Sequence, residues 1–156
     1  MNHEDFLQRA IDLAVEGVNS GTGGPFGAVI VKDGQIIAEG SNNVTTANDP
    51  TAHAEVTAIR KACQTLNTYQ LEDCTLYTSC EPCPMCLGAI YWARPKAVYF
   101  AAGHQDAADS GFDDSFIYEE INKEYESRNL PFYKLTPQKT LAPFEAWEAY
   151  EQKKEY

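Results

Sequence analysis

Residues 75–101 read TLYTSCEPCPMCLGAIYWARPKAVYFA, and this stretch decides the fold. Thr75–Thr78 has the β-branched and aromatic composition of a strand, and Ala97–Ala101 predicts another. Between them, Met85–Ala93 predicts a helix that ends before Pro95. A strand, a helix and a strand over this length predict a parallel pair joined by a crossover helix. The cysteines then lie just beyond the carboxyl end of a strand, where open α/β sheets usually bind ligands.

The segments upstream predict the rest of the sheet and two covering helices. Apolar residues recur at spacings of three and four over residues 6–18, which predicts an amphipathic helix. Phe26–Lys32 and Gln35–Glu39 are β-rich runs joined by Asp33-Gly34, which suits a type I′ hairpin turn. Because the first run is apolar, its sheet should be covered on both faces. A further helix is expected from about Ala52 to Leu66.

The remaining segments are less regular. A polar loop is expected over Ser41–Thr51, and Phe132–Leu135 is a candidate edge strand. An apolar stripe at helical spacing predicts a last helix that packs in the core or at a subunit interface, through Leu141, Phe144, Trp147 and Tyr150. Since no repeat, low-complexity tract or linker interrupts the chain, we expect one domain over residues 1–156.

Composition narrows the class of partner and the compartment. The 156 residues include 12 Lys and Arg in no cluster, and the formal charge of -11 repels phosphates, which disfavours nucleic acid. Five cysteines, with three at metal spacing, favour a reducing compartment over a disulfide framework. The acidic N-terminus lacks a signal-peptide pattern, and no apolar run approaches the ~20 residues of a membrane span. We therefore expect a cytoplasmic protein without a membrane partner.

Three metal ligands are predicted at His53, Cys83 and Cys86. The two cysteines stand three apart at the first turn of the predicted helix, so that both sulfurs face one way. The helix N-terminus lowers the cost of holding them as thiolates. Together with a neutral imidazole they leave the fourth tetrahedral position for water, which is the arrangement of catalytic zinc. We expect one Zn²⁺ per chain.

Glu55 is predicted to be the proton shuttle. It lies two residues after His53, about 200° around a helix, so it is poorly placed as a ligand. It could instead take a proton from the metal-bound water and return it to a ring nitrogen and to a leaving amine. The order H-x-E followed by P-C-x-x-C is the signature of zinc-dependent nucleobase deaminases. The sequence therefore predicts hydrolytic deamination.

Cys80 leaves one alternative open. Cys80, Cys83 and Cys86 form two overlapping C-x-x-C pairs, so that three thiols and His53 could close a structural zinc site. That reading predicts a non-enzymatic interaction protein and leaves Glu55 without a role. We prefer Cys80 as a non-ligand that ends the strand and lines the pocket wall. A redox C-x-x-C site has no reason to be paired with H-x-E.

The chain resembles the cytidine-deaminase-like superfamily, and within it the bacterial guanine deaminases. The superfamily resemblance rests on residues 51–55, TAHAE, and 79–90, SCEPCPMCLGAI. The closer resemblance rests on segments that flank the metal motif, namely residues 23–31, 42–43, 48–50, 90–95, 111–114 and 153–156. It implies an α/β/α sandwich with a mixed central sheet. It also implies one zinc per chain and the conversion of guanine and water to xanthine and ammonia.

The resemblance also implies a set of substrate-binding residues and a domain-swapped homodimer. Asn42 and Asp114 would hydrogen-bond the purine, and the other predicted contacts are Phe26, Trp92 and Ala54. A C-terminal segment at about residues 141–156 would be exchanged between subunits, so that Tyr156 covers the partner's site.

Simpler readings of these residues stay open. Asn42 could merely form a loop. Asp114 could cap a helix that starts near Phe116. Phe26 and Trp92 could be core. His104, alone in a loop, is expected to be solvated.

Two other deaminase classes share the metal motif. A tRNA adenosine deaminase must bind a folded polyanion, which the net charge disfavours. A cytosine deaminase would differ only in the polar groups that line the pocket.

Overall fold

The computed structural model describes all of residues 1–156 and divides into two units, Met1–Ser115 and Phe116–Tyr156. The first unit is built on a four-stranded sheet in the order β2-β1-β3-β4. β1 (Gly27–Lys32) pairs antiparallel with both β2 (Gln35–Ser41) and β3 (Cys74–Cys80). β3 runs parallel to β4 (Ala97–Ala102), which confirms the predicted crossover. The sheet is therefore mixed.

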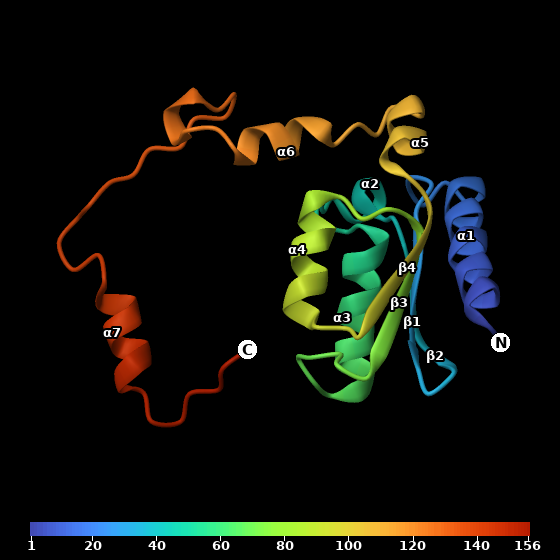
Figure 1. Ribbon diagram of the computed structural model, residues 1–156, viewed down its shortest axis with the longest axis horizontal. Coiled ribbons are helices and arrows are strands. Elements are labelled where there is room, and N and C mark those ends of the chain that lie inside the picture. The colour runs from blue at the N-terminus through green and yellow to red at the C-terminus, as the bar shows by residue number, and fades with distance from the viewer. The chain divides into compact units, whose positions relative to one another are not determined.

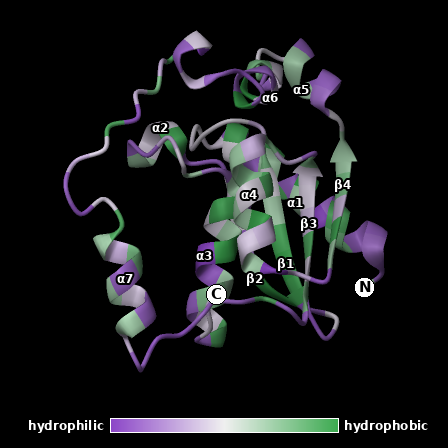
Figure 2. Cartoon of the chain, turned by 60° about the vertical axis from the view of Figure 1, so that its left-hand side comes forward, coloured by the Kyte–Doolittle hydropathy of each residue, from purple (hydrophilic) through white to green (hydrophobic).

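Helices cover both faces of this sheet, as Figure 1 shows. α1 (His3–Asn19) lies on one face, and α3 (Ala54–Leu66) and α4 (Pro84–Ala93) lie on the other. Side chains of β1 alternate between two cores: Val29 packs with residues of α1, and Ile30 packs with those of α3 and α4. The strand is apolar over most of its length (Figure 2) because both of its faces are buried. The predicted α/β/α sandwich is confirmed.

Turns and caps follow the local chemistry of the sequence. Asp33 and Gly34 have φ values of 50° and 75°, the left-handed pair that a type I′ hairpin requires. Asn2 caps α1, because its side-chain oxygen accepts a hydrogen bond from the N–H of Asp5 at 3.0 Å. α4 starts directly after Cys83 with Pro84 in its first turn, where the missing N–H of proline costs nothing. The first turn of α4 therefore points the side chains of Cys83 and Cys86 in the same direction.

Two predictions about irregular segments were wrong. The expected loop contains a short helix, α2 (Val44–Ala47), and the αL conformation of Asn48 ends that helix. Phe132–Leu135 is not a strand. An edge strand needs a neighbouring strand for its N–H and C=O groups. Phe132 instead donates its N–H to the carbonyl of Tyr125 at 3.1 Å.

The second unit contains little regular structure. α6 (Ser115–Ile121) leads into it, followed by a 3-10 turn, η1 (Tyr125–Ser127), and the predicted last helix, α7 (Ala142–Ala149). None of residues 116–156 is buried. Its exposed large apolar side chains include Leu130, Phe132, Tyr133, Leu135, Leu141, Phe144, Trp147 and Tyr150. No helix in the chain has the length and apolarity to cross a bilayer.

Candidate active site

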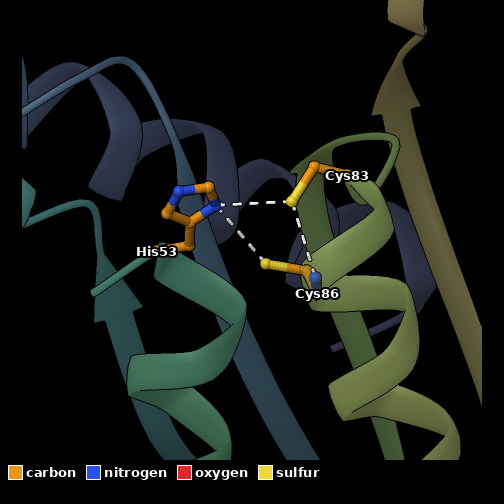
Figure 3. Close-up of side chains that lie close together, drawn as sticks. All are labelled: His53, Cys83 and Cys86. Atoms are coloured by element: carbon orange, nitrogen blue, oxygen red, sulfur yellow. Dashed lines mark hydrogen bonds between the residues drawn. The ribbon is translucent and has the colours of Figure 1, made fainter. Parts of the chain in front are cut away.

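The predicted ligands meet where two helices begin (Figure 3). His53 is the residue before α3, and Cys83 is the residue before α4. Nδ1 of His53 lies 3.5 Å from Sγ of Cys83 and 3.6 Å from Sγ of Cys86. Each of the three ligand atoms lies within 4.8 Å of the others. The fold therefore brings together residues that are 30 positions apart in the chain.

These distances fit zinc. A tetrahedral ion with Zn–S near 2.3 Å and Zn–N near 2.0 Å holds a nitrogen and a sulfur ligand about 3.5 Å apart. The Cys86 thiol, His53 and the backbone N–H of Cys86 all stabilise a thiolate at Cys83 and lower the pKa of Cys83 to about 4. The same contact with Cys83 raises the pKa of the His53 imidazole. The donor set thus suits a divalent cation.

Cys80 lies outside this group of ligands. Its thiol points to the carbonyl oxygen of Gly103, with the sulfur 3.7 Å from that oxygen. Burial raises the pKa of the Cys80 thiol, which disfavours the thiolate form that binds metal. The geometry is therefore that of two thiols and one imidazole, with Cys80 in the cavity wall.

Glu55 is buried beside the ligands, with 5% of its surface exposed. Its Oε2 accepts a hydrogen bond from Sγ of Cys86 at 3.4 Å, and its Oε1 accepts one from Oγ1 of Thr78 at 3.0 Å. Desolvation raises the pKa of the Glu55 carboxyl. A buried carboxyl group with a raised pKa holds a proton more readily than a free one, which suits a group that takes up and releases protons.

Thr78 was missed by the sequence reasoning, although a signal was present. It lies on β3 two residues after Leu76 and four after Cys74, so all three share one face of the sheet. The other two belong to the apolar core under α3 and α4. A hydroxyl group in that row must find a partner inside the protein, and the partner is Glu55.

A cavity of about 530 Å³ opens next to this group. Its walls include His53, Glu55 and Cys83, and three of the predicted substrate residues, Phe26, Asn42 and Asp114. Two others in the same unit, Ala54 and Trp92, do not line it. Ala54 is fully buried in the core, Trp92 is 62% exposed on α4, and Tyr156 is exposed in the second unit.

Asn42 holds two loops of the cavity wall together. Its Oδ1 accepts hydrogen bonds from the N–H groups of Gly24 at 3.2 Å and Val44 at 3.3 Å. Gly23 allows this approach, because a Cβ there would lie 2.1 Å from the Asn42 carbonyl oxygen. Phe26 packs edge-on against Phe112, with the ring centroids 5.0 Å apart, and both rings line the cavity. The cavity thus combines an apolar wall with an amide.

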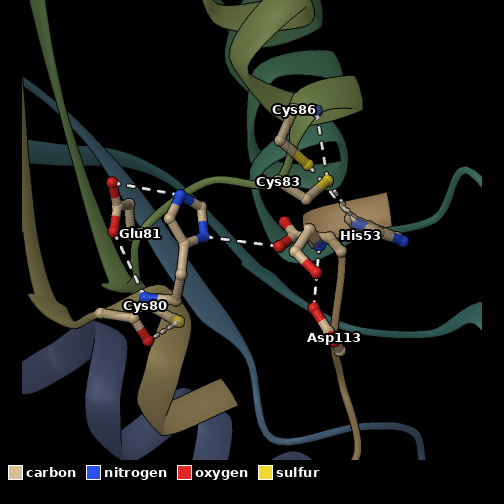
Figure 4. A network of polar contacts seen from close by, with 10 residues as sticks. His53, Cys80, Glu81, Cys83, Cys86 and Asp113 are labelled. Carbon is tan, nitrogen blue, oxygen red and sulfur yellow. Dashed lines mark hydrogen bonds and ion pairs between the residues drawn. The ribbon is translucent and has the colours of Figure 1, made fainter. Parts of the chain in front are cut away.

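The two aspartates before α6 have separate partners. Oδ1 of Asp113 accepts the N–H of Ser115 at 2.9 Å, and hydrogen bonds from the hydroxyl and from the N–H of Ser115 lower the pKa of the Asp113 carboxyl. Asp114 instead has its Oδ1 3.5 Å from Nδ1 of His104. Nε2 of His104 lies 3.2 Å from Oε1 of Glu81. Figure 4 shows Glu81 beside Cys80. His104 was expected to be solvated. Its side chain is 36% exposed, and its ring also faces Glu81 and Asp114, which the spacing of these residues in the sequence did not indicate.

Comparison with known proteins also points to a zinc-dependent deaminase. Residues 1–102 match the cytidine and deoxycytidylate deaminase zinc-binding region. A guanine deaminase from Bacillus subtilis (strain 168) is 73% identical over the full length of both chains. The X-ray structure of a guanine deaminase from Bacillus subtilis superposes with a TM-score of 0.98, covering 100% of this chain and 99% of the other.

A tRNA-specific adenosine deaminase from Aquifex aeolicus (strain VF5) is 46% identical over 102 residues, which are 65% of this chain and 67% of that protein. The match to the guanine deaminase and the family match together confirm the resemblance noted in the sequence. The chain belongs to the family defined by the zinc-binding region of cytidine and deoxycytidylate deaminases.

Proposed function

We propose that the chain is a zinc-dependent guanine deaminase that converts guanine and water to xanthine and ammonia. The observation that carries the proposal is the similarity to a guanine deaminase at 73% identity from end to end. The similarity to the tRNA deaminase, by contrast, spans about two thirds of each protein. The family match ends at residue 102, so it does not cover residues 111–114, which include the proposed substrate contact Asp114.

The charge of the cavity supports a free base over a tRNA. Its lining contains four carboxylate residues and no Lys or Arg: Glu55, Glu81, Asp113 and Asp114. Phosphate groups would be repelled by these residues and by the net charge of -11. A neutral purine with N–H donors on its edge finds acceptors there instead. The cavity volume of about 530 Å³ lies in the range of small-molecule sites.

His53, Cys83 and Cys86 would hold the zinc ion in this reaction. Zinc, when bound, makes water acidic enough to act as the nucleophile at neutral pH. Glu55 accepts the proton that the attacking water loses and delivers it to the purine ring nitrogen. The water oxygen forms a bond to the amidine carbon. The new hydroxyl then gives its proton to Glu55, which passes it to the amino group while the carbon–nitrogen bond breaks, so that a carbonyl forms and ammonia leaves. Thr78 orients Glu55 for both transfers.

Substrate recognition is assigned to the cavity wall. The Nδ2 amide group of Asn42 donates to an acceptor on the purine edge, because the Oδ1 of Asn42 already accepts from Gly24 and Val44. Asp114 accepts from the N–H edge of the base, and Phe26 covers one face of the ring. Ala54 places His53 and Glu55 through the first turn of α3. Trp92 does not line the cavity of its own chain.

We further propose a homodimer in which residues 141–156 are exchanged between the subunits. A unit that buries none of its residues while exposing many large apolar side chains lacks a core of its own. α4 also exposes three large apolar residues, namely Leu87, Tyr91 and Trp92. A second copy would cover both surfaces, and Tyr156 would then close the partner's cavity.

The test is ammonia release by purified, zinc-loaded protein with free guanine, run beside cytosine, adenine and a tRNA. Release from guanine alone is the expected result. Release from cytosine or tRNA would keep the zinc chemistry and overturn the assignment of the substrate. No release from any of them, with zinc bound, would favour a structural-zinc protein instead.

A further inference from the structure

His104 occupies a position between two carboxylates that the proposed chemistry does not use. It is the first residue of α5 (His104–Asp109), directly after the end of β4 and Gly103. Its imidazole lines the same cavity as Glu55 and Asp114. One ring nitrogen faces Glu81 and the other faces Asp114, at 3.2 and 3.5 Å. The ring therefore bridges the turn that carries the metal ligands and the loop that carries Asp114.

Glu81 anchors the ring at its far side. Its Oε2 accepts the backbone N–H of His104 at 3.3 Å, while its Oε1 faces Nε2 of the same residue. The N–H of Glu81 donates to the carbonyl of Ala102 at 2.8 Å, which fixes the backbone of Glu81 against the end of β4. With both the backbone and the ring held by one carboxylate, Nδ1 has a defined direction, and that direction is toward Asp114.

Asp114 needs such a partner because the adjacent capping bond belongs to Asp113. The N–H of Ser115 goes to Oδ1 of Asp113 at 2.9 Å, so the start of α6 does not hold Asp114. The Asp114 side chain is 20% exposed, and its Oδ1 faces Nδ1 of His104. Without the ring nitrogen opposite it, the carboxylate would be able to turn away from the cavity.

We propose that His104 is a positioning residue that holds Asp114 toward the substrate, with Glu81 as the anchor of the imidazole. This inference rests on the proposed function, in which Asp114 contacts the purine. In this proposal His104 acts through Asp114, not on the purine itself. Its effect is to fix one rotamer of Asp114 before guanine binds, so that binding does not have to restrict that side chain.

Two conservative variants separate this role from a purely structural one. The amide nitrogen of asparagine takes the place of Nδ1, so His104→Asn keeps a donor toward Asp114 and loses the contact with Glu81. The amide nitrogen of glutamine takes the place of Nε2, so His104→Gln keeps the donor toward Glu81 and loses the one toward Asp114. A role limited to anchoring α5 predicts that Gln replaces His better than Asn does. The positioning role predicts the reverse.

The experiment measures kcat and KM for guanine with the purified, zinc-loaded full chain, in whichever oligomeric state it is isolated. We expect His104→Ala and His104→Gln to lower kcat/KM by about tenfold to a hundredfold, and His104→Asn to stay within about threefold of the unmodified protein. Gln105→Ala, on the same short helix, is the matched control, because Gln105 bonds only to Asp109 in solvent at 2.7 Å and does not line the cavity.

Bound zinc and the unfolding temperature, measured on each variant, identify losses that come from the fold. An Asn variant as slow as the Gln variant, or an Ala variant with unchanged kcat/KM, would overturn the inference while leaving the proposed function intact. If the unmodified protein releases no ammonia from guanine, the proposed function fails, and the inference that rests on it fails too.

Discussion

Oγ1 of Thr78, in the middle of the sheet, donates a hydrogen bond to Oε1 of Glu55, in the first turn of α3. Both side chains are buried, so water cannot replace either partner. The hydroxyl also lies 3.1 Å from the carbonyl of Cys80, the last residue of β3. A single side chain thus links the proposed proton shuttle to the strand that leads to the cysteine ligands.

Thr78→Val tests this link with little change in shape. Removing one partner of a buried hydrogen bond costs about 1–3 kcal/mol, so we expect kcat for guanine to fall by about fivefold to a hundredfold. Zinc should stay bound, because Thr78 does not contact a ligand atom. Thr78→Ser keeps the hydroxyl and is the matched control. Steady-state kinetics with zinc analysis give the answer, and a Val variant at full speed would remove the positioning role.

Glu55→Gln removes the proton acceptor while keeping the size of the side chain. Proton transfer by a positioned carboxyl contributes about 10²–10⁴-fold, and we expect ammonia release to fall by at least the lower of these factors. His53, Cys83 and Cys86 are unchanged, so zinc content measured by mass spectrometry should remain at one per chain. Zinc retention with normal turnover would show that another group moves the proton.

The assignment of the ligands is tested by comparing cysteines. Cys83→Ser and Cys86→Ser each remove a thiolate, and we expect both variants to lose zinc and activity, since three protein ligands are the minimum of a catalytic site. Cys80→Ser is the matched control, because its sulfur points to Gly103 and lies outside the group. Loss of zinc from the Cys80 variant, with the fold intact, would instead support a closed site of three cysteines.

Hydrogen bonds between Arg9 on α1 and Glu39 on the edge strand β2 make a contribution to stability that depends on pH. Its guanidinium meets both carboxylate oxygens of Glu39 on β2, at 2.7 and 2.9 Å. These bonds lower the pKa of Glu39 below its ordinary value of 4.5. Because the folded-state pKa is the lower one, the stabilisation is present above pH 4.5 and is lost as the pH falls through the lowered value.

We therefore expect Glu39→Gln to reduce the free energy of unfolding by about 0.5–1 kcal/mol at pH 7, because the pair is partly exposed and solvent screens it. The difference from the unmodified protein should shrink as the pH falls well below 4.5. Urea unfolding at several pH values measures it. Glu16→Gln is the comparison, since Glu16 also meets Arg9 at 2.8 Å but is 60% exposed. An equal effect of both variants at every pH would contradict the assignment.

The C-terminal segment is tested by truncation. Deletion of residues 151–156 removes Tyr156 and none of the cavity residues. If Tyr156 closes a cavity, guanine turnover should slow while zinc stays bound. Light scattering gives the mass of both proteins in parallel, and we expect a dimer for the full chain. Unchanged turnover would remove the capping role, and a monomer with full activity would remove the exchange of segments.

Local chemistry made much of this site predictable. The spacing of Cys83 and Cys86 at a helix start sets both sulfurs on one side, whatever the rest of the chain does. Residues two positions apart lie about 200° apart around a helix, so the H-x-E order points His53 and Glu55 in different directions. The hairpin at Asp33-Gly34 and the apolar run of β1 are likewise properties of short segments. The irregular segments were less accessible, since α2 depends on loop contacts and Phe132–Leu135 has no neighbouring strand.

The sequence by itself predicted the donor set, the proposed proton shuttle and the succession of strands and helices along the chain, because the H-x-E pattern, the C-x-x-C pattern and each element depend on residues within a few turns of chain. Only the tertiary structure decided which groups orient them. Thr78 reaches Glu55 across 23 positions, and His104 lies between Glu81 and Asp114, 23 and 10 positions away. Such contacts depend on sheet register and on how helices pack over it, and no short-range spacing encodes either of them.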